Sequence, residues 1–193
     1  MLDPSDEARL VSRLKRRDER AFAVLVEKHQ RQVFAIVFRM LGDRAEAEDV
    51  AQEVFVTVFK AIDRFRGDSK LSTWIYRIAT NHCRNRIKYL GRRHHGRTKD
   101  IDDTQESTFL SALSDPAPRP DAAFEGKRME VAVQEALAAI EPDHREVIVL
   151  RDLEQLPYQE IAEILAVAEG TVKSRLFRAR AALQAEIQAR TGP

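Results

Sequence analysis

The sequence predicts an all-α protein with two helical domains joined by a flexible linker. Along most of its 193 residues, apolar side chains recur at spacings of three and four, as on helices that bury one face, and no segment shows a convincing strand pattern. Between residues 94 and 124 this periodicity is lost, and the chain becomes polar and acid-rich, with prolines at Pro116, Pro118 and Pro120. We therefore expect a larger domain at 1–93, a linker at 94–124 and a shorter domain at 125–193.

The charge of the chain is balanced overall but segregated along the sequence. Apolar residues make up 44% of the chain, enough for compact cores, and charged residues make up 33%, which is high for a plain globular protein. The net charge is +1, yet residues 84–99 hold seven Lys or Arg and no acid, whereas residues 43–53 hold five acids and one Arg. Blocks of opposite charge indicate separate partners for separate surfaces.

The compartment is predicted from cysteine usage and from the apolar runs. The single cysteine, Cys83, rules out an internal disulfide and fits a reducing environment. Residues 1–10 carry acids and no apolar signal segment, and the longest apolar run, residues 33–38, is far too short to span a bilayer. We expect a cytoplasmic protein without direct membrane insertion.

Two long helices are predicted in the first half, from Asp18 to Leu41 and from Arg44 to Phe65. Gly42 ends the first helix, whose apolar stripe consists of Phe22, Leu25, Val26, Val33, Ile36 and Val37. The second helix has a core stripe of Val50, Val54, Val58, Ala61, Ile62 and Phe65. Its opposite face is polar and presents Asp49, Gln52, Glu53 and Lys60. Residues 64–70 (RFRGDSK) then form a loop.

A third helix, predicted from about Leu71 to near Gly91, carries two stripes rather than one. The first is an ordinary core stripe of Leu71, Ile75, Ile78, Ala79 and Cys83. The second, which we call the Trp74 seam, consists of Trp74, Arg77, Asn81, Arg84 and Lys88. Folding alone does not require an aromatic ring, an amide and three cations in one row, so the seam is a candidate binding surface.

Residues 156–183 have the form of a helix, a short turn and a second helix. The buried side of the first helix consists of Leu156, Ile161, Ile164 and Leu165. Residues 167–170 (VAEG) make the turn. The buried side of the second helix consists of Val172, Leu176, Ala179 and Leu183. Its remaining faces carry hydroxyls, cations and one aromatic ring: Thr171, Lys173, Ser174, Arg175, Phe177, Arg178 and Arg180. This pattern predicts a DNA-binding helix-turn-helix, although a two-helix hairpin with a basic solvent face has the same periodicity.

Residues 47–93 and 156–183 together resemble an extracytoplasmic-function sigma factor of bacterial RNA polymerase. The motif RFRGDSKLSTWIYRIATN at residues 64–81 is highly specific, and its pairing with the C-terminal motif is more so. The resemblance implies a region 2-like domain at 1–93 that binds core polymerase and the −10 promoter element. It also implies a region 4-like domain at 125–193 that binds the −35 element through its helix-turn-helix.

The resemblance assigns a role to each polar surface. It assigns docking on core polymerase to Asp49, Gln52 and Glu53. Capture of the −10 element as a single strand falls to Arg66, Ser69, Lys70, Trp74, Arg77, Asn81, Arg84 and Lys88. Contact with the −35 duplex falls to Thr171, Lys173, Ser174, Arg175, Phe177 and Arg178. The chemistry is consistent, because unstacked bases seek aromatic or guanidinium planes and the backbone seeks cations. From the residues alone, the acids at 49–53 also suit a solvated helix N-terminus, and Trp74 also suits a half-buried core position.

The linker must reach between two separated DNA elements. In the family the −10 and −35 elements lie about 25 base pairs apart, which is roughly 85 Å. Two domains of about 80 residues cover about a third of that span, so the linker reaches only when it is held extended. In the family this segment threads the polymerase interior, and the acids Asp100, Asp102, Asp103 and Glu106 suit a basic channel. A merely solvated tether remains the alternative.

Other function classes are disfavoured by what the sequence lacks. It shows no nucleophile with a base, no glycine-rich phosphate loop and no carboxylate pair on a defined scaffold, so we expect no enzyme, no cofactor and no small-molecule substrate. Zinc binding by His82, Cys83, His94 and His95 is disfavoured because the two pairs sit about 17 Å apart on a continuing helix. A stand-alone helix-turn-helix regulator and a protein-binding helical adaptor remain as alternatives. Because family members are commonly held by a cognate anti-sigma factor, we expect one here as well.

Overall fold

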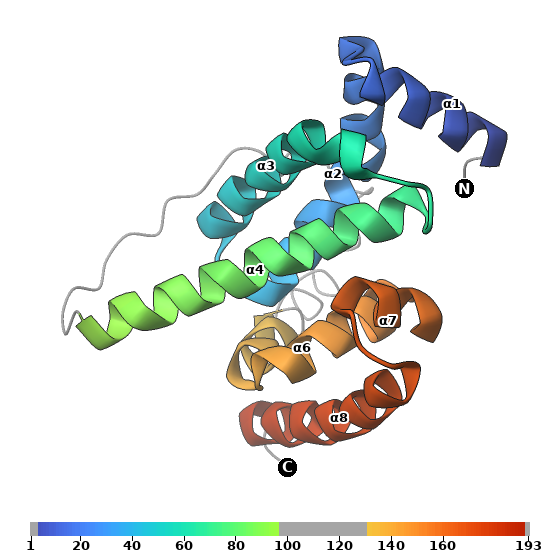
Figure 1. The fold of residues 1–193 in the computed structure, drawn as a ribbon. Coiled ribbons are helices and arrows are strands. Elements are labelled where there is room, and N and C mark those ends of the chain that lie inside the picture. Colours follow the sequence, from blue (N-terminus) through green and yellow to red (C-terminus); the bar gives the residue numbers. More distant parts are fainter. Residues whose placement is uncertain (1–3, 97–130, 192–193) are drawn as a thin grey trace, which may run out of the picture.

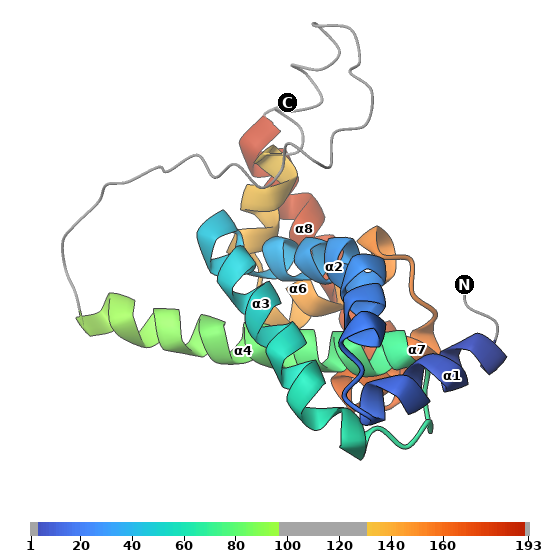
Figure 2. The same cartoon turned by 90° about the horizontal axis from the view of Figure 1, so that it is seen from above.

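The computed structural model describes residues 4–96 and 131–191, and the elements within them are helical (Figures 1 and 2). The N-terminal half contains α1 (Pro4–Lys15), α2 (Glu19–Leu41), α3 (Arg44–Ala61), the short η1 (Ile62–Arg64) and α4 (Leu71–Gly96). The C-terminal half contains a helical segment at 131–139, α6 (Pro142–Ile148), the π-helical turn η3 (Val149–Leu153), α7 (Tyr158–Leu165) and α8 (Glu169–Thr191). The predicted all-α class is confirmed.

Side-chain caps explain where the N-terminal helices begin and end. The Asp18 carboxylate accepts hydrogen bonds from two backbone N–H groups of the first turn of α2, and Asp43 does the same once for α3. Gly42, with φ of 78°, ends α2 in the left-handed conformation that glycine adopts without strain. The backbone N–H of Leu71, at the start of α4, donates to the Glu7 carboxylate of α1 at 3.0 Å. The first helix therefore caps the fourth.

The predicted end of the third long helix near Gly91 is wrong, because α4 continues to Gly96. A glycine in a helix interior costs about 1 kcal/mol, which weakens the helix but does not end it. The two glycines with positive φ in the described residues are Gly42 and Gly67, so Gly91 does not adopt the conformation that ends α2. The remainder of the predicted linker, residues 97–124, lies outside the described residues, and the domain boundaries stay a prediction.

The core of the N-terminal half is formed by α2, α3 and α4, which pack against one another. The predicted core stripe of α4 is buried at Leu71, Ile75, Ala79 and Cys83, while Ile78 is half-buried. Tyr76 is also buried, and its hydroxyl donates to the side-chain oxygen of Gln32 at 2.6 Å. Tyr76 thus ties α4 to α2 and is not part of the Trp74 seam.

The C-terminal half has the predicted helix-turn-helix, with a slightly different turn. Helix α7 ends at Leu165, and Ala166 takes the left-handed conformation with φ of 55°. Helix α8 begins at Glu169, so the second half of the predicted turn is already helical. Val172, Leu176 and Ala179 are buried, as their spacing predicts.

The two halves are packed on each other. Helix α7 lies beside α4 (Figure 1). Helix α2 contacts both α6 and η3. The buried apolar residues of the two halves belong to one continuous cluster. Across the described parts of the chain, no helix combines the length and the apolar character that crossing a membrane requires.

Candidate nucleic-acid and protein interfaces

The Trp74 seam runs along one side of α4. Arg77, Asn81 and Lys88 are exposed, whereas Trp74 and Arg84 are half-buried. The indole ring of Trp74 packs against the ring of Phe65, with 5.4 Å between their centroids. Packing holds the ring in one orientation and leaves part of it accessible. The seam can therefore offer a fixed aromatic surface beside cations and an amide.

The loop before α4 adds a second part to this surface. Gly67 has φ of 81°, a left-handed conformation that lets the chain turn sharply between Phe65 and Ser69. Arg66 is exposed and pairs with Asp68 at 3.2 Å. A cavity of about 500 Å³ lies between this loop and α1, lined by Phe65, Gly67, Ser69 and residues of α1. Its lining combines the apolar Val11 and Phe65 with the polar Ser69.

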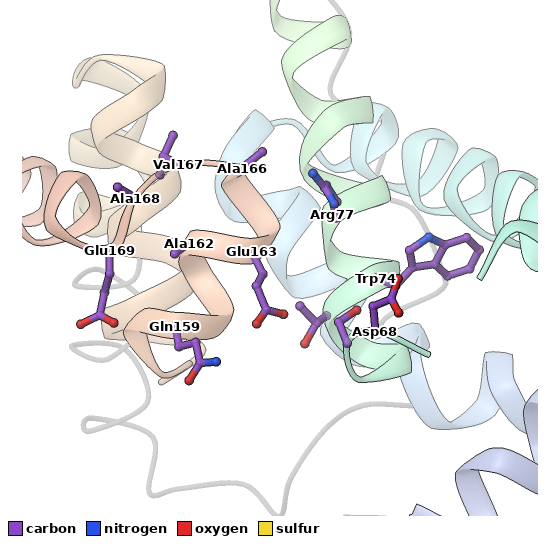
Figure 3. Close-up of a pocket in the computed structure, with 12 residues that line it drawn as sticks. Asp68, Trp74, Arg77, Gln159, Ala162, Glu163, Ala166, Val167, Ala168 and Glu169 are labelled. Atoms are coloured by element: carbon purple, nitrogen blue, oxygen red, sulfur yellow. The ribbon is translucent and has the colours of Figure 1, made fainter. Parts of the chain in front are cut away.

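A wider cleft of about 650 Å³ separates the seam from the helix-turn-helix. Trp74 and Arg77 line one side, and α7 with the following turn lines the other (Figure 3). Figure 3 shows Glu163 extending from α7 into the gap between α7 and α4. Glu169, at the start of α8, also belongs to the cleft wall. The side with α4 thus carries a ring, a cation and the Asp68 carboxylate, and the side with α7 carries further carboxylates.

Two cations that the sequence assigns to DNA are bonded to acids of the C-terminal half. Arg84 donates through Nε and Nη2 to the two oxygens of Glu146, at 2.6 Å each. Lys70 pairs with Glu160, which raises the pKa of the Lys70 ammonium through that hydrogen bond and its charge. Burial raises the pKa of the fully buried Glu146 carboxyl, and the hydrogen bonds from Arg84 oppose that shift.

Sequence reasoning missed these acids. Glu146 belongs to the segment REVIVL, where a charged pair directly precedes an apolar run. Arg145 and Glu146 are both buried, and Arg145 donates to the backbone oxygens of Met40, Ala138 and Ile140. A charged residue in a buried segment requires a partner. The charged pair before this apolar run could therefore have indicated a buried ion pair.

The polar face of α3 is exposed at Asp49, Gln52 and Glu53. Glu53 accepts a hydrogen bond from Arg86 at 2.9 Å and lies 3.3 Å from His82 Nδ1, so α4 holds its side chain in place. Val56, one turn further along, is 50% exposed. This face of α3 therefore presents one apolar side chain beside exposed acids, of which Glu53 is held by α4. Val56 follows Gln52 by four residues, so the sequence could have indicated that this apolar residue lies on the polar face of α3.

The outer face of α8 is accessible. Lys173, Ser174, Phe177 and Arg178 are exposed, and Phe177 is exposed to 79%. Thr171 and Arg175 are half-buried. Lys173 and Arg175 pair with Glu169 and Asp143, both within the C-terminal half. The structure therefore brings all six predicted residues onto the N-terminal part of one helix.

Metal binding receives no support from the side chains that the structure describes. His82 Nε2 lies 3.0 Å from the Thr57 hydroxyl, and its Nδ1 faces Glu53. Cys83 is buried. His94 and His95 lie outside the residues whose side chains are described. Among residues 6–92 and 131–190, no group of three or more His, Cys, Asp or Glu could hold an ion.

Comparison with known proteins identifies the family. Residues 25–93 match the family model for sigma-70 region 2, and residues 130–183 match that for sigma-70 region 4. The chain belongs to the sigma-70 family. More narrowly, its relatives place this sigma factor in the extracytoplasmic-function class. It is 36% identical over 181 residues to the ECF RNA polymerase sigma-E factor of Escherichia coli, covering 93% of each chain.

Other relatives agree. The chain is 37% identical over 188 residues to the RNA polymerase sigma-H factor of Pseudomonas aeruginosa, covering 97% of both chains. Among solved structures, CnrH in complex with the cytosolic domain of CnrY matches with a TM-score of 0.66 and 25% identity, over 95% of this chain and 97% of that one. The sigma factor RpoE from Bartonella quintana, solved with the anti-sigma factor NepR, has the same fold, with a TM-score of 0.64, 22% identity and coverage of 86% and 96%. The protein is thus a sigma factor rather than a stand-alone regulator.

Proposed function

We propose that this sigma factor directs initiation through three surfaces, each on a different helix. Asp49, Gln52 and Glu53 on α3 dock on core polymerase. The Trp74 seam, with Arg66, Ser69 and Lys70 of the adjoining loop, captures the −10 element as a single strand. Helix α8 contacts the −35 duplex through Thr171, Lys173, Ser174, Arg175, Phe177 and Arg178. The corresponding domains are residues 1–93 and 125–193, joined by the linker at 94–124.

The observation that carries this proposal is the Trp74 seam. A half-buried indole fixed by Phe65 lies beside the exposed Arg77 and Asn81 on one helix. Stacking on an aromatic ring contributes about 1–3 kcal/mol per base, and cations hold the phosphates of the same strand. Asn81 carries a paired donor and acceptor that can read one base edge. A surface of this kind favours an unpaired strand over a duplex.

Strand opening in this scheme needs no catalytic group. The protein binds the open strand better than the duplex and so shifts a population that thermal opening already provides. Unstacking costs a few kcal/mol per base, which stacking on the seam offsets. We therefore assign no enzymatic activity to the protein, and we place its action in the cytoplasm with RNA polymerase.

An anti-sigma factor is the third proposed partner. The CnrH structure was solved with the cytosolic domain of CnrY, and that protein matches this chain over almost its full length. Two accessible surfaces are available to such a partner. One is the face of α3 with its acids and Val56, and the other is the cleft beside α4. We propose that it acts by covering one or both.

The test is initiation in a purified system. Wild-type protein and the variants Trp74→Ala, Asn81→Ala and Asp49→Ala/Gln52→Ala are mixed with sigma-free bacterial core polymerase and a pool of promoter fragments. We expect the α3 variant to lose polymerase binding, and the two seam variants to bind polymerase but fail to open the promoter. Lys60→Ala, also exposed on α3, serves as the control. Initiation at wild-type level by both seam variants would contradict the proposed role of the Trp74 seam.

A further inference from the structure

A network of side-chain contacts joins the polar face of α3 to α4. Arg86 of α4 donates to Glu53 at 2.9 Å and also pairs with Glu46. His82, one turn earlier on α4, lies with Nδ1 3.3 Å from Glu53 and with Nε2 3.0 Å from the Thr57 hydroxyl. Two residues of α4 and three of α3 therefore form one continuous network.

Donors on α4 hold both carboxylate oxygens of Glu53. Arg86 contacts Oε1, and His82 contacts Oε2. A carboxylate only accepts hydrogen bonds, so His82 donates to it through Nδ1. In the neutral ring Nε2 is then an acceptor, and the Thr57 hydroxyl donates to it. Glu53 is thus fixed from two directions, and His82 is itself held in place by α3.

Arg86 is the most enclosed member of the ion-paired part of this network. Its side chain is 20% exposed, against 26% for Glu46 and 50% for Glu53. Burial opposes the charge of the Arg86 guanidinium, but its hydrogen bond to Glu46 and the surrounding carboxylates raise its pKa overall. A charged, enclosed guanidinium that bridges two carboxylates restricts both of them.

The exposed part of Glu53 can still bind a partner. Each carboxylate oxygen has two acceptor positions, and α4 uses one on each oxygen. The remaining positions can accept the paired N–H groups of an arginine or the ammonium of a lysine. Asp49 and Gln52 are exposed on the same helix. A cationic partner surface therefore meets a carboxylate that is already oriented.

Helix α4 makes these contacts on a different face from the Trp74 seam. His82 and Arg86 are four residues apart and contact α3. Arg84, which belongs to the seam, instead contacts Glu146 of the C-terminal half. Figure 1 shows α3 on the side of α4 away from α7. A substitution at Arg86 therefore leaves the side chains of the seam in place.

We propose, resting on the function proposed above, that Arg86 and His82 are positioning residues for docking: they hold Glu53 in the orientation in which cationic side chains of core polymerase bind it. A side chain that is ordered before binding loses less conformational entropy at the interface. The gain appears as slower dissociation, because short-range contacts form only after the encounter.

The charge of Arg86 has the opposite effect. Arg86 neutralises part of the acidic surface of α3 and so weakens the long-range attraction of that surface for a cationic partner. If Arg86 affects docking through its charge alone, its removal strengthens binding through faster association. If Arg86 orients Glu53, its removal weakens binding through faster dissociation. The two roles therefore predict changes of opposite sign in affinity.

The test measures association and dissociation of the full-length protein on immobilised, sigma-free core polymerase. The variants are Arg86→Gln, Glu53→Gln, their combination, and His82→Asn. Lys60→Gln is the matched control, because it also removes one positive charge, from the exposed surface of α3. Promoter opening by each variant is measured at a saturating concentration of the protein.

We expect Arg86→Gln to dissociate about three- to tenfold faster than wild type, the effect of one side chain that must be ordered on binding. His82→Asn should act in the same direction with a smaller effect, because Arg86 still holds Oε1 of Glu53. Lys60→Gln should dissociate at the wild-type rate. In the Glu53→Gln background, Arg86→Gln should add little, because it acts through Glu53.

Two results overturn the positioning role. One is wild-type or tighter binding of polymerase by Arg86→Gln, because charge alone then accounts for Arg86. The other is failure of Arg86→Gln to open the promoter at saturating concentration, because an intact seam should open it and the defect then lies in the fold. If Glu53→Gln itself binds polymerase as wild type does, the docking role proposed for α3 is wrong. If Glu53→Gln weakens binding and Arg86→Gln does not, the positioning role alone is wrong.

Discussion

The recognition helix α8 and the Trp74 seam of α4 have similar chemistry but different accessibility. Each places cations and one large ring on the side of an amphipathic helix. On α8, Phe177 is 79% exposed, and Lys173 and Arg175 pair with acids of their own half. On α4, Trp74 is half-buried, and Arg84 is held by an acid 62 residues away in the chain. The difference teaches that neighbouring elements, and not the helix itself, decide whether a binding surface is open.

The two halves also differ in the ionisable groups that they bury. The N-terminal half buries His29, which is 7% exposed on α2. The C-terminal half buries Arg145 and Glu146 at its contact with α2 and α4. A buried neutral imidazole makes the free energy of unfolding depend on pH. A buried ion pair between the halves affects how strongly they associate. Three predictions test how far this comparison holds.

The largest expected effect concerns the shared core. Ile75 of α4 and Leu176 of α8 are 0% and 2% exposed, and each belongs to the continuous apolar cluster. Ile75→Ala and Leu176→Ala should each lower the free energy of unfolding by about 2–5 kcal/mol. Because the core is continuous, both should shift one common transition in urea or in calorimetry.

Val24→Ala is the control, because Val24 is 48% exposed and its loss should change stability by less than about 0.5 kcal/mol. A Leu176→Ala protein that shows a separate, earlier transition, with the remainder melting as in wild type, contradicts a single cooperative unit. The two halves then fold independently, and their packing contributes little to either.

The second effect is the pH dependence that His29 confers. Burial, with a smaller contribution from the charge of Lys28, lowers the pKa of His29 to about 4. In the unfolded chain the pKa is about 6.5, so between about pH 6.5 and 4 the unfolded state takes up a proton that the folded state does not. Stability should fall over that window by up to about 3 kcal/mol and level off below it.

Urea titrations at a series of pH values measure this loss. His29→Leu should remove most of the slope between pH 6.5 and 4 while the remaining acid sensitivity persists. An unchanged slope in the variant means that other groups, and not His29, account for the acid response.

The smallest effect separates the two DNA surfaces directly. Arg178 is exposed on α8, so Arg178→Ala should weaken binding of the free protein to −35 duplex DNA by about 1–3 kcal/mol. Arg77→Ala, an equal change of charge on the other surface, should leave duplex binding nearly unchanged. Fluorescence anisotropy at two salt concentrations provides the measurement. Equal losses in both variants would indicate a general charge effect rather than two distinct surfaces.

Much of the fold could be predicted from local patterns. The apolar spacing located the core stripes, and Gly42 correctly marked the end of α2. The buried positions of α8 followed from the same periodicity. Prediction failed at Gly91, because a lone glycine without the left-handed conformation does not stop a helix whose neighbours favour it.

The sequence by itself determined the helices, the residues that each one buries, and the resemblance that led to the sigma-70 family. Only the tertiary structure decided which polar residues meet. Arg84 and Glu146 lie 62 residues apart, Lys70 and Glu160 lie 90 apart, and Arg39 and Glu154 lie 115 apart. The physical reason is that helical periodicity reports whether a position faces the core, whereas the partner of a charge depends on which elements pack together. The engagement of Arg84 on α4 by Glu146 and the exposure of Asp49 on α3 are consequences of that packing.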